Sequence, residues 1–275
     1  MLVFPNAKLN LGLHITARRP DGFHTLETAM VPLPWTDALE VLPAPEAAET
    51  SLTLTGRPVP GEPATNLCVR AYELLRADFP QVPAVRLHLH KVVPIGAGLG
   101  GGSADAAFAL RALNTVLALN LSDDALEAYA RRLGSDCAFF IRNQPALALG
   151  RGDELSALPL PQLAGAACKV IYPNLHISTA EAYAGVTPRP PQHALGTALA
   201  APINTWRDTV VNDFEASLAP KFPVLAQLKE QLYAAGAAYA SLSGSGSAVF
   251  GLWPGQSAPP KLALKADYEV WDGVL

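Results

Sequence analysis

The sequence is poor in the residues that mark several large classes of protein. Cysteine occurs only at Cys68, Cys137 and Cys168, without a C-x-x-C pair, so we expect neither a disulfide framework nor a structural zinc site. Charged residues make up 16% of the chain and the net charge is −4, so no basic field favours a nucleic-acid partner. The histidines form no H-E-x-x-H motif, and no transition metal is expected.

Long apolar runs are also absent. Half of the 275 residues are apolar, yet no run reaches the roughly twenty residues of a membrane span, and Pro5, Lys8 and Asn10 interrupt the start of the chain. We therefore expect no membrane segment and no signal peptide, and a cytoplasmic location. The length suffices for one large or two modest domains, each with its own core.

Five glycines crowd into one short stretch between positions 94 and 104. Before it, apolar and polar residues alternate over 85–90, which predicts a half-buried strand. After it, apolar residues recur at helical spacing over 106–117. The stretch is therefore predicted to be a turn from a strand into a helix.

Such a turn is suited to binding an anion. We expect Ser103 to cap the helix, whose first N–H groups have no partner within the helix and carry the positive end of its dipole. Glycine lets a ligand approach the backbone closely and tolerates positive φ angles. The simplest ligand for this turn is a phosphate group.

The spacing argues against two common phosphate loops. A Walker A loop needs lysine after its last glycine, whereas Ser103 follows Gly102 here. A G-x-G-x-x-G match runs from Gly96 to Gly101, but the acidic residues at 123–124 begin the next helix instead of ending a second strand, which disfavours dinucleotide binding. A flexible linker is disfavoured because regular, apolar elements flank the glycines.

The remaining pattern, P-x-G-x-G-L-G-G-G-S-A, resembles the ATP loop of the GHMP kinase superfamily of small-molecule kinases. The resemblance implies that ATP, with Mg²⁺, is bound by Pro94, Ile95, Gly96, Ala97, Gly98, Leu99, Gly100, Gly101, Gly102, Ser103 and Ala104. It makes Ser103 a candidate metal ligand, and it adds Asn66 and Lys91 as nucleotide contacts. Asn66 is also a good helix cap on its own account.

The alternation over residues 7–14 places Lys8 and Asn10 on one face of a strand. For a lone lysine, the ordinary interpretation is a solvent-exposed face. However, the string Pro5-Asn-Ala-Lys-Leu-Asn-Leu-Gly-Leu13 resembles the first motif of this kinase superfamily. The resemblance implies that Lys8 lies beside the transferred phosphoryl group and that Asn10 contacts the acceptor.

A second charged residue comes from the string Gly134-Ser-Asp-Cys-Ala-Phe-Phe140. By itself Asp136 could cap or begin the next element. The string resembles the segment that supplies the catalytic aspartate of the superfamily, which makes Asp136 the partner of Lys8 in catalysis. The sequence leaves open whether Asp136 is a general base or an electrostatic positioner.

The substrate is indicated by Asp21-Gly-Phe-His-Thr-Leu26, which as a bare pattern is an ordinary hairpin turn. It resembles the cytidine-binding segment of kinases that phosphorylate a cytidine diphosphate-linked methylerythritol. Phe23 would then stack on the cytosine, and His24 would hydrogen-bond its edge. The same resemblance places Thr179 and Tyr183 at the substrate, with Tyr183 as the second aromatic face; simple helix packing is the alternative for Tyr183.

The resemblance also implies an α+β fold, the GHMP kinase fold, in two domains. A domain like domain 2 of ribosomal protein S5 would span residues 1–154 and bind ATP, and a ferredoxin-like domain would span 155–275. A second glycine-rich run, Ser241–Gly251, resembles the third motif of the superfamily. The segment 212–215 fits its second domain.

Two alternatives to this function stay open at the level of sequence. The chain could be another GHMP kinase, acting for example on mevalonate or homoserine, or a nucleotide-binding protein of the same fold without turnover. Lys8 and Asp136 argue against the second, because a binding module has no need of a charged pair at the reaction point. A monomer and a homodimer are both compatible with the sequence.

Overall fold

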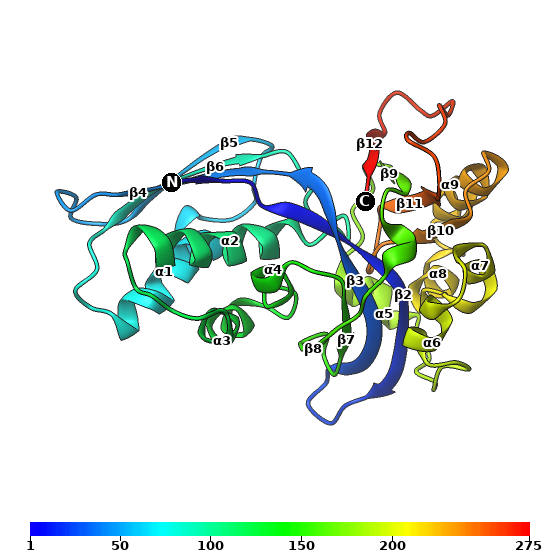
Figure 1. Ribbon diagram of the computed structural model, residues 1–275, viewed down its shortest axis with the longest axis horizontal. Coiled ribbons are helices and arrows are strands. Elements are labelled where there is room, and N and C mark those ends of the chain that lie inside the picture. Colours follow the sequence, from blue (N-terminus) through cyan, green and yellow to red (C-terminus); the bar gives the residue numbers. More distant parts are fainter. The chain divides into compact units, whose positions relative to one another are not determined.

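The computed structural model describes all residues, 1–275, and its contacts divide the chain into two compact units of three segments each (Figure 1). The first unit consists of Met1–Ala7, Trp35–Ile95 and Gly100–Gln144. The second consists of Lys8–Pro34, Gly96–Leu99 and Pro145–Leu275. The glycine-rich stretch thus contributes to both units, while the predicted domain boundary after residue 154 stays a prediction.

The first unit is built on one four-stranded sheet with the order β1-β4-β6-β5. Its strands are β1 (Leu2–Val3), β4 (Ala38–Pro43), β5 (Ser51–Gly56) and β6 (Val85–Lys91). Pairing is antiparallel except between β5 and β6, which run parallel. Strand β6 alternates between buried and exposed residues, which confirms the strand predicted before the glycines.

Helices lie on one face of this sheet (Figure 1). They are α1 (Leu67–Asp78), α2 (Gly101–Val116), α3 (Asp123–Leu133) and α4 (Phe139–Arg142), with a 3₁₀ turn at Pro63–Thr65. The side chain of Ser122 accepts a hydrogen bond from the Ala125 amide at 3.3 Å and so caps α3. Asn66 caps α1 in the same way, through the Cys68 amide at 2.9 Å.

The prediction that Ser103 caps α2 is wrong. Gly100 occupies the N-cap with a φ of +70°, a left-handed conformation that glycine adopts without strain, and the helix begins at Gly101. Ser103 therefore lies within the first turn of α2.

The second unit contains two four-stranded sheets. One has the order β2-β3-β7-β8 and is made of β2 (Asn6–Arg18), β3 (His24–Thr36), β7 (Ala146–Leu149) and β8 (Glu154–Ala157). The other has the order β10-β11-β9-β12 and is fully antiparallel, with β9 (Ala167–Tyr172), β10 (Tyr239–Leu242), β11 (Val249–Trp253) and β12 (Glu269–Val274).

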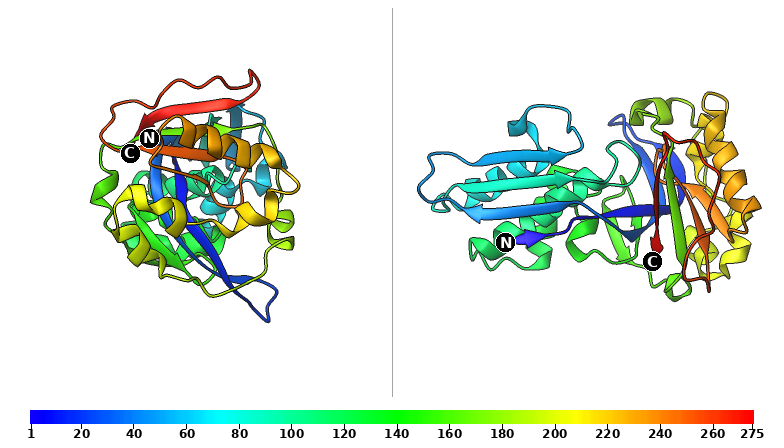
Figure 2. Two further views of the ribbon diagram at one scale, coloured as in Figure 1. Left: turned by 90° about the vertical axis from the view of Figure 1, so that its right-hand side faces the viewer. Right: turned by 90° about the horizontal axis from the view of Figure 1, so that it is seen from above.

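The helices of this unit are α5 (Thr179–Ala184), α6 (Leu195–Ala200), α7 (Trp206–Thr209), α8 (Asp213–Leu218) and α9 (Pro223–Ala234), with 3₁₀ turns at Pro161–Leu163 and Ile203–Thr205. Helix α9 covers one face of the second sheet (Figure 2). Leu13 and Ile15 of β2 share an apolar core with Phe214 of α8 and Leu232 of α9. No helix is long and apolar enough to cross a membrane.

Candidate active site

Strand β2 buries its polar residues as well as its apolar ones. Lys8 and Asn10 are 3% and 2% exposed, so the interpretation of a solvent-exposed strand face is wrong, while their predicted common orientation is confirmed. The Lys8 ammonium donates hydrogen bonds to Asn10 Oδ1 and, at 3.2 Å, to the carbonyl oxygen of Gly98. The side-chain nitrogen of Asn10, Nδ2, donates to Thr28 Oγ1 at 3.0 Å. The oxygens of Asn10 and Gly98 thus help to hold the ammonium in one place.

The two glycine-rich loops meet at Gly98. Its φ is +77°, and a Cβ atom there would lie 1.9 Å from the carbonyl oxygen of Ser243 in the loop between β10 and β11. The Ser243 hydroxyl donates to the Gly98 carbonyl at 2.8 Å and accepts from the backbone N–H of Asn10 at 3.3 Å. Only glycine permits both this backbone conformation and this approach.

The start of α2 has the features of an anion site. Ala104 makes the first intrahelical hydrogen bond, from its amide to the Gly100 carbonyl at 2.9 Å, so the amides of residues 101–103 precede the helical hydrogen-bond ladder. A Cβ atom at Gly102 would meet no atom within 4 Å. Helix N-termini with an open approach favour phosphate groups.

Ser103 and Cys137 lie side by side in the first unit. Burial raises the pKa of the Cys137 thiol to about 11, and a hydrogen bond with the Ser103 side chain acts against that rise. Asp136, the residue before Cys137, is partly exposed in the turn between α3 and α4. Ala138 occupies the N-cap of α4 and no side chain caps it, so Asp136 is not a helix cap.

Lys91, at the end of β6, is 3% exposed and lies between two carboxylates. Its ammonium bonds to Asp37 Oδ2 and, at 2.7 Å, to Asp105 Oδ2 of α2. A Cβ atom at Gly101 would lie 3.1 Å from the same ammonium. The other oxygen of Asp37 accepts the amides of residues 92 and 93, so the cluster fastens the segment that enters the glycine stretch to the helix that leaves it.

This cluster has perturbed protonation equilibria. Burial, together with the negative charge of Asp37, raises the pKa of Asp105 to about 7 against the opposing effect of Lys91. Burial lowers the pKa of Lys91, but the two carboxylates outweigh it and hold that pKa above its ordinary value. Asp105 Oδ1 is buried without a hydrogen-bond partner.

The predicted cytidine-binding residues all belong to the second unit, where His24 and Tyr183 are in contact. Phe23 is 56% exposed at the tip of the β2–β3 hairpin, with the Arg151 guanidinium 5.0 Å from its ring. The His24 ring stacks on Tyr183 of α5, with centroids 4.6 Å apart. Tyr183 also meets the core residue Phe214 edge-on, so it takes part in helix packing as well. Thr179 is exposed at the first position of α5.

Comparison with known proteins identifies the family. The model of the GHMP kinases N terminal domain matches residues 66–150, and that of the GHMP kinases C terminal domain matches 196–271. A 4-diphosphocytidyl-2-C-methyl-D-erythritol kinase of Cytophaga hutchinsonii is 49% identical over 253 residues, which cover 92% of each chain. The chain belongs to the 4-diphosphocytidyl-2-C-methyl-D-erythritol kinases.

Solved structures agree with this family and with its fold. The structure of a 4-(cytidine 5'-diphospho)-2C-methyl-D-erythritol kinase aligns with a TM-score of 0.77 at 32% identity, over 99% of this chain and 98% of that one. A mevalonate kinase of Methanococcus jannaschii has a TM-score of 0.69 at 12% identity, over 100% and 98% of the two chains, which shows the shared fold alone. The GHMP kinase fold, α+β with N- and C-terminal domains, is thereby confirmed.

The second unit brings together Lys8, Asn10 and Gly98, and separately His24 and Tyr183. The first unit holds Asn66, Lys91, Ser103 and Asp136. The structure places these residues, while their roles toward ATP, metal and substrate stay predictions.

Sequence reasoning missed four residues of this kinase that contact the predicted ones. Asp37 and Asp105 accept hydrogen bonds from Lys91, and Thr28 accepts one from Asn10. Ser243 donates one to Gly98. Asp105 carried a weak signal, because an acidic residue three positions after the last glycine lies in the first turns of the helix. Asp37 and Thr28 carried no signal in the sequence, since Lys91 and Asn10, their respective partners, are remote from them in the chain.

Proposed function

We propose that this chain transfers the γ-phosphoryl group of ATP to the 2-hydroxyl of 4-diphosphocytidyl-2-C-methyl-D-erythritol, a step of the methylerythritol phosphate route to isoprenoid precursors. The observation that carries the proposal is the buried ammonium of Lys8, bonded to Asn10 and to Gly98 of the glycine-rich stretch. The full-length likeness to relatives of that name supports the choice of acceptor.

The amides of residues 101–103 and the dipole of α2 would hold the ATP phosphates. Phosphoryl transfer needs chiefly positioning and stabilisation of the charge on the transferred group. Gly102 offers an open approach to the backbone, since nothing lies within 4 Å of where its Cβ would be. ATP therefore fits the residues at this helix start.

Mg²⁺ in kinase sites is bound mainly through substrate phosphates, water and one or two protein oxygens. No group of three or more His, Cys, Asp or Glu side chains is arranged as a metal site. The Ser103 hydroxyl, in the first turn of α2, is the protein oxygen that we assign to the ion. Bound together with ATP, Mg²⁺ would supply positive charge that offsets the charge of the phosphates.

Lys8 would offset the negative charge that develops during transfer and would lower the pKa of the acceptor hydroxyl. Asn10 would contact the acceptor: its oxygen is used by Lys8 and one N–H by Thr28, which leaves a second N–H. Asp136 would accept the hydroxyl proton or hold the hydroxyl in line. Phe23, His24, Thr179 and Tyr183 would bind the cytidine end.

The test is ATP-dependent phosphorylation of 4-diphosphocytidyl-2-C-methyl-D-erythritol, followed by ADP release, with mevalonate and homoserine as parallel acceptors. Turnover with the cytidyl acceptor alone supports the proposal. Turnover with another acceptor instead overturns the substrate and the roles of Phe23, His24 and Tyr183. ATP binding without turnover of any acceptor leaves the nucleotide-binding protein as the function.

A further inference from the structure

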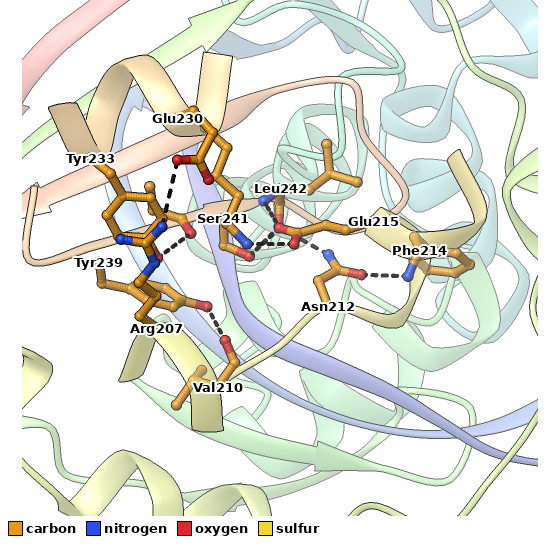
Figure 3. A network of polar contacts seen from close by, with 12 residues as sticks. Arg207, Val210, Asn212, Phe214, Glu215, Glu230, Tyr233, Tyr239, Ser241 and Leu242 are labelled. Atoms are coloured by element: carbon orange, nitrogen blue, oxygen red, sulfur yellow. Dashed lines mark hydrogen bonds and ion pairs between the residues drawn. The ribbon is translucent and has the colours of Figure 1, made fainter. Parts of the chain in front are cut away.

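One short segment of the second unit, Asn212–Glu215, lies between the strand that carries Lys8 and the second glycine-rich loop. It covers the N-cap and the first three residues of α8 (Figure 3). The proposed function assigns no role to these residues. Three of their side chains, those of Asn212, Asp213 and Glu215, make hydrogen bonds to the backbone of other elements.

Asn212 is 3% exposed and uses both ends of its side-chain amide. The nitrogen donates to the carbonyls of Leu242 and Gly244, each at 2.9 Å. The oxygen accepts the Phe214 amide at 3.0 Å and so begins α8. Because the two carbonyls flank Ser243, this one amide fixes the backbone on both sides of that residue.

Glu215 fixes the strand that leads into the same loop (Figure 3). Its Oε1 accepts the Leu242 amide and the Ser241 hydroxyl, both at 2.9 Å. Its other oxygen pairs with Lys229 at 2.6 Å. The carboxylate therefore fixes the last two residues of β10, directly before Ser243.

The opposite side of the segment binds β2. The Leu13 amide donates to the carbonyl of Val211 at 2.9 Å, and the Ile15 amide donates to Asp213 Oδ2 at 2.8 Å. Asp213 Oδ1 also lies 3.7 Å from His14 Nδ1. Burial acts to raise the pKa of the Asp213 carboxyl, but the hydrogen bonds with His14 and the Ile15 amide outweigh it and lower that pKa. The strand with Lys8 and Asn10 is thus held along its edge.

These contacts close a ring. It runs from β2 to Asn212, from Asn212 to the carbonyls around Ser243, and from Ser243 back to Asn10 and Gly98. We propose that Asn212 and Glu215 are positioning residues, which set the Ser243 loop against Gly98 and thereby fix the Gly98 carbonyl that holds the Lys8 ammonium. Neither side chain needs to touch a substrate. The inference rests on the proposed kinase function.

The decisive variant is Asn212→Asp. It keeps the size of the side chain and the oxygen that begins α8, but it replaces the donor to Leu242 and Gly244 with a carboxylate oxygen. Since misplacement of reacting groups by about 1 Å can cost about 10²-fold in rate, we expect kcat to fall by about 10- to 100-fold. The KM values for ATP and acceptor should stay within about threefold of wild type, because no substrate contact is removed.

Glu215 supplies a conservative pair of variants. Glu215→Gln keeps an oxygen acceptor for Leu242 and Ser241 and loses only the ion pair with Lys229, so kcat should remain near wild type. Glu215→Ala loses the acceptor, and its kcat should fall. A Gln variant as damaged as the Ala variant would assign the effect to charge or packing and overturn the positioning role.

Ser122→Ala is the matched control, because it removes a helix cap in the other unit without touching a loop. Its melting temperature should fall while kcat stays unchanged. Hydrogen exchange of peptides covering 95–100 and 239–249 gives a readout that needs no turnover: both should exchange faster in Asn212→Asp and not in Ser122→Ala. Unchanged exchange, or faster exchange with a wild-type kcat, would overturn the inference.

If the wild type phosphorylates no acceptor, the proposed function fails. The exchange result then still decides whether Asn212 fixes the two loops. The two failures are therefore distinguishable.

Discussion

The imidazole ring of His24 stacks on the phenol ring of Tyr183, with centroids 4.6 Å apart and an angle of 21° between the planes. The first ring comes from β3 and the second from α5, and Tyr183 is fastened edge-on to Phe214. His24 therefore already covers one face of Tyr183. A cytosine that is to stack on that face of Tyr183 must first displace the imidazole.

We expect His24→Ala to raise the KM for the cytidyl acceptor by about tenfold while kcat changes little. The variant loses a hydrogen bond to the substrate worth about 1–2 kcal/mol, which weakens binding of the cytidine end without affecting the transferred phosphoryl group. Steady-state kinetics with each substrate varied in turn provides the check. The KM for ATP is the internal control and should not move. A fall in KM for the acceptor would instead show that the stacked ring blocks the base.

Lys8→Met should reduce kcat by at least about 10²-fold, since it removes a preorganised charge that would oppose the negative charge of the transition state. The side chain is buried, and methionine has a similar length without the charge, so we expect folding to be retained. Single-turnover measurements and a melting curve together provide the test. Near-wild-type turnover in the folded variant would exclude Lys8 from catalysis.

Asp136→Asn should lower kcat by roughly 10²–10⁴-fold, the range typical of a lost general base. Asp136 is not the cap of α4, so the substitution should leave that helix intact. Comparison of kcat with circular dichroism of the same preparation checks both expectations. A variant with nearly full turnover would leave Asp136 without a catalytic role.

Asp105 should make the stability of the protein depend on pH. Its pKa rises from 3.8 in the unfolded chain to about 7 in the fold, so between these values the native state binds more protons than the unfolded state. The free energy of unfolding should therefore decrease as pH rises from about 4 to about 7, and then level off. Asp105→Asn should flatten this slope in urea unfolding measured across that range. Equal slopes for both proteins would contradict the perturbed carboxyl.

Gly98→Ala should destabilise the fold by at least about 1–3 kcal/mol, the cost of a non-glycine residue in the left-handed region, before the clash with Ser243 is added. Urea unfolding measures the loss. Gly196→Ala is the control, because that glycine lies in α6 with no atom within 4 Å of a Cβ and a φ outside the positive region. The control should be neutral or more stable, by up to about 1 kcal/mol. Equal stabilities of the two variants would contradict the close approach at Gly98.

Much of the local structure could be predicted because its causes lie within a few residues. The alternation over 85–91 defines β6, and Ser122 with Gly134 defines the two ends of α3. The cap of α2 was mispredicted for a reason that is also local: Gly100 adopts a left-handed conformation and is the N-cap, three residues before Ser103. Glycine conformation cannot be deduced from hydrophobic periodicity.

Burial and pairing across long stretches of chain could not be predicted. Lys91 is buried because Asp37, 54 residues earlier, neutralises it, and β2 is buried on both faces because distant segments cover it. For the candidate site, resemblance to a family supplied Lys8, Asn10 and the glycines. It did not supply Ser243 or Asn212 as their supports, since those contacts depend on how the chain folds back on itself.

The same ring of contacts has a consequence for the order in which the protein is made. Lys8 leaves the ribosome more than two hundred residues before Asn212 and Ser243. A nascent chain that ends at residue 154 contains Lys8 and all of the first glycine-rich stretch, but the edge of β2 at Leu13 and Ile15 has no partner yet. The surroundings of the Lys8 ammonium are therefore completed only after Ser243 has been synthesised.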